Sequence, residues 1–322
     1  MTTLRWFLAR RLAFTVGAVW ALITGMFALV TYVPDPNLGL VGWGAAVGGG
    51  EPAVAVEGYL EARGRNAPLH EQYLSWIVGF ATFEWGWSHS QQAPVRGVVL
   101  DAVLVSAVYI VPAVVVSTLA SLLLGYYAAV RRTSPVETVA RVGAYACAAV
   151  PAFLIAAVAL NYLLFEFHVV TIYYDDQRHV LSRTNLQTLA IPALTLALTL
   201  FGVQARYVRS QAMRYAAMDF TKLARSKGVG EVRVARHVLR NAAVPLLSVS
   251  FAELLTVFLL TIYVLEVIFH VPGIGLIGYE AIDARDFGLI FGAMLVPVLL
   301  GLLGNLVLDV AHVVLHPQAE LE

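Results

Sequence analysis

The sequence predicts an all-α integral membrane protein with six transmembrane helices. Its 322 residues are 59% hydrophobic and only 13% charged, with a mean hydropathy of +0.76. A soluble domain typically carries about 25% charged residues, so this chain has too few polar side chains to cover a surface in water. Six apolar runs are each long enough to cross a bilayer, which takes about 20 residues. The runs are Leu12–Val33, Gly97–Val130, Val139–His168, Leu189–Tyr207, Val244–Phe269 and Phe287–Leu315.

The first apolar run has two possible interpretations, a membrane span or a cleaved signal peptide. Three arginines, Arg5, Arg10 and Arg11, precede it, and a basic segment followed by an apolar one is typical of both. The run is long for a signal peptide, and residues 32–34 form a poor cleavage site. We therefore expect residues 1–33 to be an N-terminal segment with an uncleaved first helix.

Residues 34–95 differ in composition from the apolar runs around them. They contain three consecutive glycines at 48–50, several prolines and six acidic residues, and short helices are expected near Val54–Arg63 and Leu69–Val78. We interpret this segment as a small extracytoplasmic domain between the first two membrane helices.

The second and third apolar runs each contain a proline, Pro112 and Pro151 respectively. Proline removes a backbone donor and crowds the preceding helical turn. We expect both prolines to bend their helices.

The distribution of arginine and lysine predicts the orientation, because cytoplasmic loops of membrane proteins are enriched in them. With the N-terminus inside, the inner segments hold fifteen basic residues and the outer segments five or six. Both termini, including the tail 316–322, are therefore expected in the cytoplasm.

Residues 206–245 form a basic segment between the fourth and fifth runs, with nine arginines and lysines. Apolar residues recur at helical spacing from Met213 onward, Gly228 favours a helix end, and Pro245 marks the return to an apolar run. We predict a cytoplasmic hairpin whose first helix spans 213–228. An apolar stripe on an exposed helix is typical of a helix that docks in a groove of a partner.

The motifs of nucleotide and metal sites are missing or lack their context. Residues 273–278 satisfy G-x-G-x-x-G, but they follow an apolar span rather than a strand, so a dinucleotide site is not expected. Neither Lys222 nor Lys227 lies in a phosphate-binding loop, the histidines are scattered, and Cys147 is the sole cysteine. We expect no enzymatic activity, no metal and no cofactor on this chain.

Ionisable residues inside membrane spans are candidates for function because they are costly to bury. Glu253 lies well inside the fifth run and is our candidate for a residue of a transport pathway. It also supports an alternative function, a proton-coupled secondary transporter. We expect Asp101, Glu266 and Asp309 to reach the membrane interface. No filter-like segment supports an ion channel.

Several motifs, in this order and at this spacing, resemble the integral-membrane permease subunits of ABC importers for peptides and nickel. The central one is the Ala-Arg-x-Lys-Gly sequence that ends at Gly228. The others are Arg10-Arg11-Leu12, Phe83–Ser88 with Pro94-Val95, Arg236–Ala242, and Glu266-x-x-Phe269-x-x-Pro272-Gly273-x-Gly275 followed by Arg285-Asp286. Departures are a fifth span without the expected glycines, and His316-Pro317-Gln318 at the C-terminus.

The resemblance implies a core, residues 96–315, that pairs with a homologous permease to give twelve spans. Two cytosolic ATPases, which would hold the ATP and magnesium, and an extracytoplasmic substrate-binding protein would complete an importer in the cell membrane. The hairpin would couple to the ATPases, and the glycine-rich motif would form an extracytoplasmic turn. The implied coupling residues are Asp219, Phe220, Lys222, Leu223, Ala224, Arg225, Ser226, Lys227 and Gly228, and the implied turn residues are Glu266, Pro272, Gly273 and Gly275.

Overall fold

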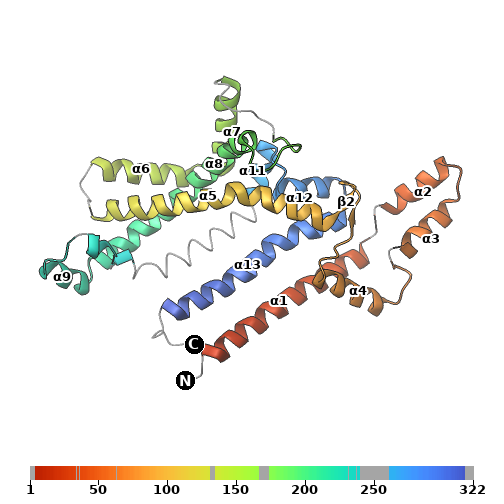
Figure 1. Cartoon of the computed structure of the whole chain (residues 1–322), viewed down its shortest axis with the longest axis horizontal. Coiled ribbons are helices and arrows are strands. Elements are labelled where there is room, and N and C mark those ends of the chain that lie inside the picture. Colours follow the sequence, from red (N-terminus) through yellow and green to blue (C-terminus); the bar gives the residue numbers. More distant parts are fainter. Residues whose placement is uncertain are drawn as a thin grey trace. The chain divides into compact units, whose positions relative to one another are not determined.

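A computed structural model describes residues 4–33, 35, 37–62, 64–130, 135–166, 174–230, 232–236, 238–239 and 261–315. The chain separates into two compact units. Unit 1 comprises residues 1–99 and 280–299, and unit 2 comprises residues 100–279 and 300–322. Each unit is described separately below (Figure 1).

The described part of the chain contains four helices that are long and apolar enough to cross a membrane. Two further helix pairs qualify if each pair, bent at a short break, counts as one span, which gives up to six. The four helices are α1 (Leu4–Tyr32), α5 (Val95–Val130), α8 (Arg183–Ala216) and α13 (Phe287–Leu315). The structure is therefore consistent with the predicted all-α membrane class.

The third predicted span is not one straight helix. It consists of α6 (Pro135–Ala149), α7 (Ala152–Ala159) and the π-helix η1 (Leu160–Glu166), and the chain bends by 98° between α6 and α7. Pro151 lies at this bend, where it cannot continue the hydrogen-bond ladder of α6 but can precede the first turn of α7. The expected bend at Pro151 is confirmed, whereas Pro112 lies inside α5, which continues as one helix.

Unit 1 holds the segment between the first two membrane helices. Its helices are α2 (Asn37–Val47), α3 (Pro52–Ala62) and α4 (Leu69–Ala81), followed by an antiparallel pair of two-residue strands, β1 (Trp87–Ser88) and β2 (Ala93–Pro94). The predicted short helices correspond to α3 and α4, while α2 and the strands were not predicted.

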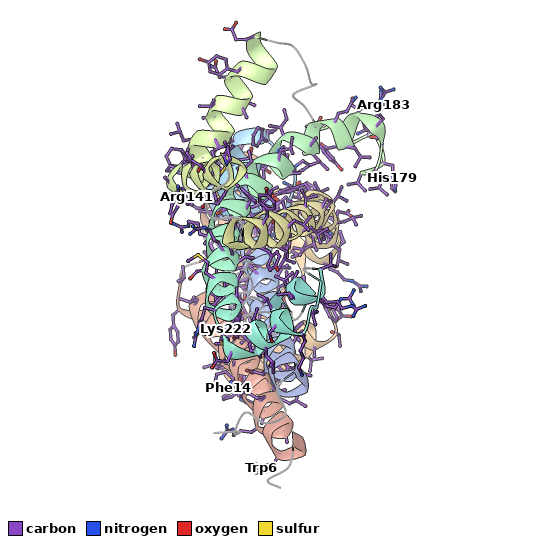
Figure 2. All side chains as sticks on the ribbon, turned by 90° about the vertical axis from the view of Figure 1, so that its left-hand side faces the viewer. Trp6, Phe14, Arg141, His179, Arg183 and Lys222 are labelled. Atoms are coloured by element: carbon purple, nitrogen blue, oxygen red, sulfur yellow. The ribbon has the colours of Figure 1, made fainter. Side chains whose placement is uncertain are left out.

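Helix α4 packs against α1 inside unit 1. The rings of Phe27 and Tyr73 lie 5.2 Å apart, and Thr24 Oγ1 lies 2.7 Å from the hydroxyl of Tyr73. At the other end of α1, Trp6 and Phe14 are 67% and 66% exposed and project outward (Figure 2). Apolar side chains that face outward from a membrane helix suit contact with lipid.

Unit 2 is organised around α8, which packs against α6 and α5. A Cβ added to Gly202 would lie 2.5 Å from Ala148 N, and one added to Gly125 would lie 2.9 Å from Ala205 O. These glycines let the helix backbones approach closely, as is common in membrane bundles. Figure 2 shows His179 and Arg183 near the start of α8, and Lys222, which follows the end of α8 in the sequence.

The fifth predicted span, Val244–Phe269, lies largely outside the described residues. Its described part is α11 (Ile262–Phe269), which is followed at a bend of 81° by α12 (Ile274–Asp283).

Candidate functional site

The predicted helix 213–228 is divided in the structure. Met213 belongs to the last turn of α8, which ends at Ala216, and a separate short helix, α9 (Asp219–Ser226), follows after a turn. Asp219 lies in the first turn of α9, where a negative charge interacts favourably with the helix dipole. Helical spacing alone did not reveal this break, because the apolar residues on both sides of it keep a common period.

One side of α9 is anchored to the rest of unit 2. Thr221 is 1% exposed and donates a hydrogen bond to the carbonyl oxygen of Tyr215 over 2.9 Å. Next to this contact lies a cluster of four buried residues, against which Met213, Tyr215 and Val229 pack. The cluster consists of Ala129, Ala212, Val234 and Val238. The cluster therefore joins the end of α5, the end of α8 and residues 234 and 238, and the residues that flank α9, Tyr215 and Val229, pack against it.

The opposite side of α9 is open. Phe220 and Leu223 are 39% and 56% exposed, although both are large apolar residues. Lys222 forms an exposed ion pair of 3.0 Å with Asp219. Ser226 and Lys227 are also exposed, while Ala224 is half-buried. Arg225 lies in α9, but its side chain is outside what the structure describes. The helix thus presents an apolar pair bordered by charge.

Gly228 terminates α9 as the sequence predicts. Its φ is +72°, a left-handed conformation that costs a residue with a Cβ about 1–2 kcal/mol. The N–H of Val229 donates to the carbonyl of Ala224 over 3.1 Å, as in a Schellman motif. The direction in which the chain leaves α9 therefore depends on this glycine.

A buried carboxylate joins α6 to α8 in unit 2. Glu137 is 2% exposed, and its Oε1 accepts hydrogen bonds from Arg141 and from Arg209, each over 3.1 Å. Arg206 lies over the ring of Tyr145, with its Cζ 5.6 Å from the ring centroid. Arg206 and Arg209, which belong to the basic segment, thus make contacts within the chain. Sequence reasoning did not identify Glu137, because nothing local marks it as buried.

Glu266, which the sequence predicts to reach the membrane interface, is fully buried inside unit 2. Its carboxylate accepts hydrogen bonds from Ser106 and Tyr109 of α5, over 2.6 and 3.0 Å. It also accepts the N–H groups of Gly275 and Leu276, over 2.6 and 3.2 Å. A carboxylate that binds the free N–H groups at a helix start is stabilised by that helix. Glu266 therefore connects α5, α11 and α12.

The predicted extracytoplasmic turn is shorter than expected. Glu266 belongs to α11 and Gly275 to α12, so only Pro272 and Gly273 of that set lie between the helices. A Cβ on Gly273 would overlap the Glu266 carboxylate and the Ser106 hydroxyl, and one on Gly275 would lie 2.7 Å from Tyr263 Cα. The glycines are required for close packing around Glu266 and not for a long loop.

Two motifs of the resemblance meet in unit 1, although they are far apart in the sequence. Asp286 is buried and follows Arg285, and its Oδ2 accepts hydrogen bonds from Ser88 Oγ over 2.7 Å and from the N–H and hydroxyl of Ser90, each over 3.0 Å. Its Oδ1 accepts the N–H of Leu289 over 3.2 Å. Burial alone would raise the pKa of Asp286, but these hydrogen bonds together hold the pKa below its usual value.

Replacing Asp286 with asparagine is expected to lower the melting temperature at pH 7 and to lower it less in acid. A depressed pKa stabilises the folded chain fully above the unfolded pKa, about 3.9 for aspartate, and this contribution is lost as the pH falls through the folded pKa. Melting curves of the detergent-solubilised protein at pH 7 and pH 3 check this. Asp283→Asn, an exposed neighbour, is the control. An equal fall in melting temperature at both pH values would contradict a lowered pKa for Asp286.

Glu253, the predicted pathway residue, lies outside the described residues. Within the described part of the chain, no group of three or more histidine, cysteine, aspartate or glutamate residues could hold a metal ion.

Comparisons with known proteins agree with the motifs. Residues 121–320 match the family described as the binding-protein-dependent transport system inner membrane component. The chain is 25% identical to the inner membrane ABC transporter permease protein YejB of Escherichia coli O157:H7, over 98% of this chain and 99% of that one. It is 28% identical to a putative peptide transport system permease protein of Brucella abortus, over 96% of each. It is 29% identical to the glutathione transport system permease protein GsiC of Salmonella choleraesuis, over 79% of this chain and 80% of that one.

The family match covers more than half of the chain and includes α6, α8, α9 and the Glu266 region. The relatives match over most of their length, and they are permease components, which are not themselves enzymes. The chain therefore belongs to the binding-protein-dependent transport system inner membrane component family and is a multi-pass plasma-membrane permease of the peptide/nickel type of ABC transporter.

Proposed function

We propose that this chain is one of two homologous permease subunits of an ATP-driven importer and that it couples to a cytosolic ATPase through α9. The observation that carries the proposal is the combination of an anchored side and an open apolar side on a short helix. Thr221 is buried and hydrogen-bonded to the end of α8, and the flanking residues Tyr215 and Val229 pack on the buried cluster, while Phe220 and Leu223 remain exposed. Such a helix suits a groove on the surface of a partner.

The proposed assembly contains this chain, a second permease, two ATPases that bind ATP and magnesium, and an extracytoplasmic substrate-binding protein. In this chain, residues 34–95 form the extracytoplasmic insert and residues 96–315 the transport core. The core and α1 contribute six spans with both termini in the cytoplasm, which places α9 on the cytosolic side, as the distribution of basic residues indicates.

The proposed substrates are peptides or similar small solutes. The supporting observation is that relatives of this chain are named for peptide and glutathione transport. Membership of the family favours this role over the alternative of a proton-coupled secondary transporter that uses Glu253.

The proposed mechanism requires ATP binding to favour one of two conformations of the permease pair. A ligand shifts such an equilibrium only by its difference in affinity for the two states. Reversing a 1:99 population takes about 5.5 kcal/mol. Closure of the ATPase pair would supply this difference by drawing the two α9 helices together. Because Thr221 of α9 is hydrogen-bonded to Tyr215 in the last turn of α8, movement of α9 would shift α8.

Gly228→Val is expected to reduce uptake and substrate-stimulated ATP hydrolysis at least tenfold while leaving membrane insertion intact. Valine is strained at a φ of +72°, so the chain would leave α9 in a different direction. The measurement is ATP hydrolysis by the reconstituted transporter, with the amount of inserted subunit determined in parallel.

The control is Gly230→Val, two residues further along. Gly230 has no positive φ, and a Cβ there would meet nothing within 4 Å. Wild-type uptake and ATPase stimulation in Gly228→Val would count against coupling through α9.

A further inference from the structure

Unit 1 contains a cavity of about 800 Å³ between α1, α4, the segment that follows α4, and the start of α13. This volume lies within the range of about 300–1,000 Å³ typical of small-molecule sites. The cavity is lined by side chains of the segment between the first two membrane helices and by the adjoining ends of two spans. Neither α9 nor Glu266 contributes to its lining.

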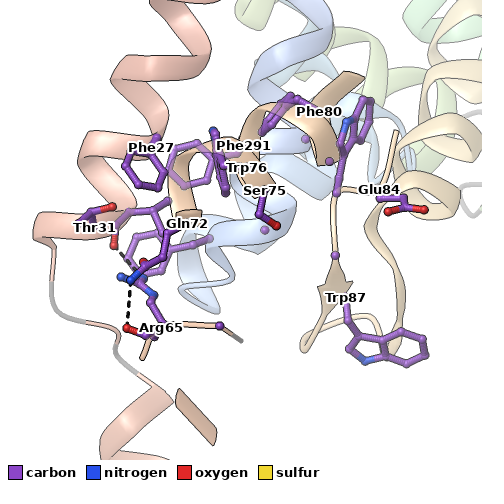
Figure 3. Close-up of a pocket in the computed structure, with 18 of the residues that line it drawn as sticks. Phe27, Thr31, Arg65, Gln72, Ser75, Trp76, Phe80, Glu84, Trp87 and Phe291 are labelled. Atoms are coloured by element: carbon purple, nitrogen blue, oxygen red, sulfur yellow. Dashed lines mark hydrogen bonds between the residues drawn. The ribbon is translucent and has the colours of Figure 1, made fainter. Parts of the chain in front are cut away.

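Seven of the residues that line the cavity are phenylalanine or tryptophan. Trp76 contacts Phe80 and Phe291 with ring centroids 5.0 and 6.1 Å apart, and its ring lies 6.2 Å from that of Phe27. Figure 3 shows Phe27, Trp76 and Phe291 on one side of the cavity and Glu84 and Trp87 on the other. Aromatic faces bind apolar groups and also attract cations.

The polar groups of the wall favour a cationic ligand. Two acidic side chains, Glu71 and Glu84, line the cavity together with Asp286, while Arg65 is the one lysine or arginine among its described lining residues. Arg65 is already engaged, since it donates to the carbonyl of Val30 over 2.8 Å. Asp286 is engaged by the two serines described above. Residues 34–95 as a whole carry six acidic and two basic residues, so the segment, like the cavity wall, has a net negative charge.

Two groups in the wall could bind the polar atoms of a ligand. The indole N–H of Trp85 is buried without an acceptor among the described residues, and the carboxylate of Glu84 is exposed. A buried donor without an acceptor destabilises the empty cavity, and a ligand carbonyl could satisfy it. The cavity therefore offers one acceptor for a cation, one donor for a carbonyl oxygen, and aromatic surface for an apolar group.

We propose that this cavity binds the N-terminal part of a short apolar peptide, with the ammonium group at Glu84, the first carbonyl at Trp85 and the side chains on the aromatic wall. This assignment rests on the proposed function, because it names the class of substrate that the importer meets outside the cell. A ligand with ammonium, carbonyl and apolar groups matches all three features of the wall, whereas a lipid chain would use only the aromatic one.

The test measures binding of the dipeptide amide Phe-Leu-NH2 to the full chain in nanodiscs by isothermal titration calorimetry. Wild type is expected to bind it, and to bind the N-acetylated form at least tenfold more weakly because the ammonium is lost. Glu84→Gln is expected to weaken binding of the free amine at least fivefold. Trp85→Phe, which keeps an aromatic ring but lacks the N–H donor, is expected to weaken both forms.

The matched control is Glu61→Gln, which makes the same change of charge at an exposed residue of α3 that does not line the cavity. It is expected to bind Phe-Leu-NH2 like wild type. Equal affinity for the free and acetylated forms, or unchanged binding in Glu84→Gln, would overturn the proposal and indicate an apolar cavity for lipid. Absence of binding to wild type would also overturn it. The assay contains no ATPase, so its outcome is independent of the Gly228 experiment.

Discussion

If α9 docks on an ATPase as proposed, Leu223→Glu is expected to abolish transport by disrupting the apolar contact that α9 would make with it. Leu223 is 56% exposed in the isolated chain, so a glutamate there is tolerated by the fold. In the assembly the same position would lie in a groove, where truncation of a central apolar residue costs about 2–4 kcal/mol. That corresponds to a loss of affinity of roughly 30-fold to 1,000-fold. A buried carboxylate would cost more.

The measurement is co-purification of the ATPase subunits with the permease in mild detergent, together with uptake in cells. Val232→Glu is the control, because Val232 is 77% exposed in the same basic segment but lies outside α9. The coupling proposal requires Leu223→Glu to lose the ATPase and Val232→Glu to retain it. Normal retention of the ATPase by Leu223→Glu would show that α9 is not the docking element.

Gly273→Val is expected to destabilise the permease itself. A Cβ at this position would overlap the carboxylate of Glu266 and the hydroxyl of Ser106, so the hydrogen bonds that connect α5, α11 and α12 could not all persist. Overpacking costs about 1–3 kcal/mol, and an unsatisfied buried polar group costs about the same again. For a chain of this size the expected fall in melting temperature is roughly 10 °C or more.

The melting temperature is measured in detergent, and size-exclusion chromatography monitors the loss of the folded protein on heating. Gly143→Val provides the control, since Gly143 lies in α6 and a Cβ there would meet nothing within 4 Å. A melting temperature for Gly273→Val equal to that of wild type would refute the role of Gly273 in packing. Ser106→Ala removes one donor to Glu266 without adding volume and is expected to have a smaller effect.

The features that the sequence predicted correctly are local ones. Apolar runs of sufficient length predicted the membrane helices, and α13 has the same bounds as its predicted span. Gly228 marked the end of α9 because the residue at a left-handed helix terminus is usually glycine. Pro151 marked the bend in the third span for an equally local reason, the missing backbone donor.

The features that the sequence did not reveal depend on residues far apart in the chain. Glu137 and Arg209 are 72 positions apart, Ser106 and Glu266 are 160 apart, and Ser88 and Asp286 are 198 apart. Helix α12 was missed because the carboxylate at its N-terminus comes from α11 and the preceding Pro272-Gly273 suggested a turn. Charge alone could not show which arginines of the basic segment bind within the chain.

The close packing of α6 on α8 has a mechanical consequence. Gly202 brings the two backbones together and the Glu137–Arg209 ion pair fixes their register, so α6 and α8 should rotate as one rigid body. A displacement of α9, near the end of α8, would then be transmitted to the far end of α6. At that end the chain bends by 98° into α7, so the same displacement would move α7 in a direction roughly perpendicular to its own axis.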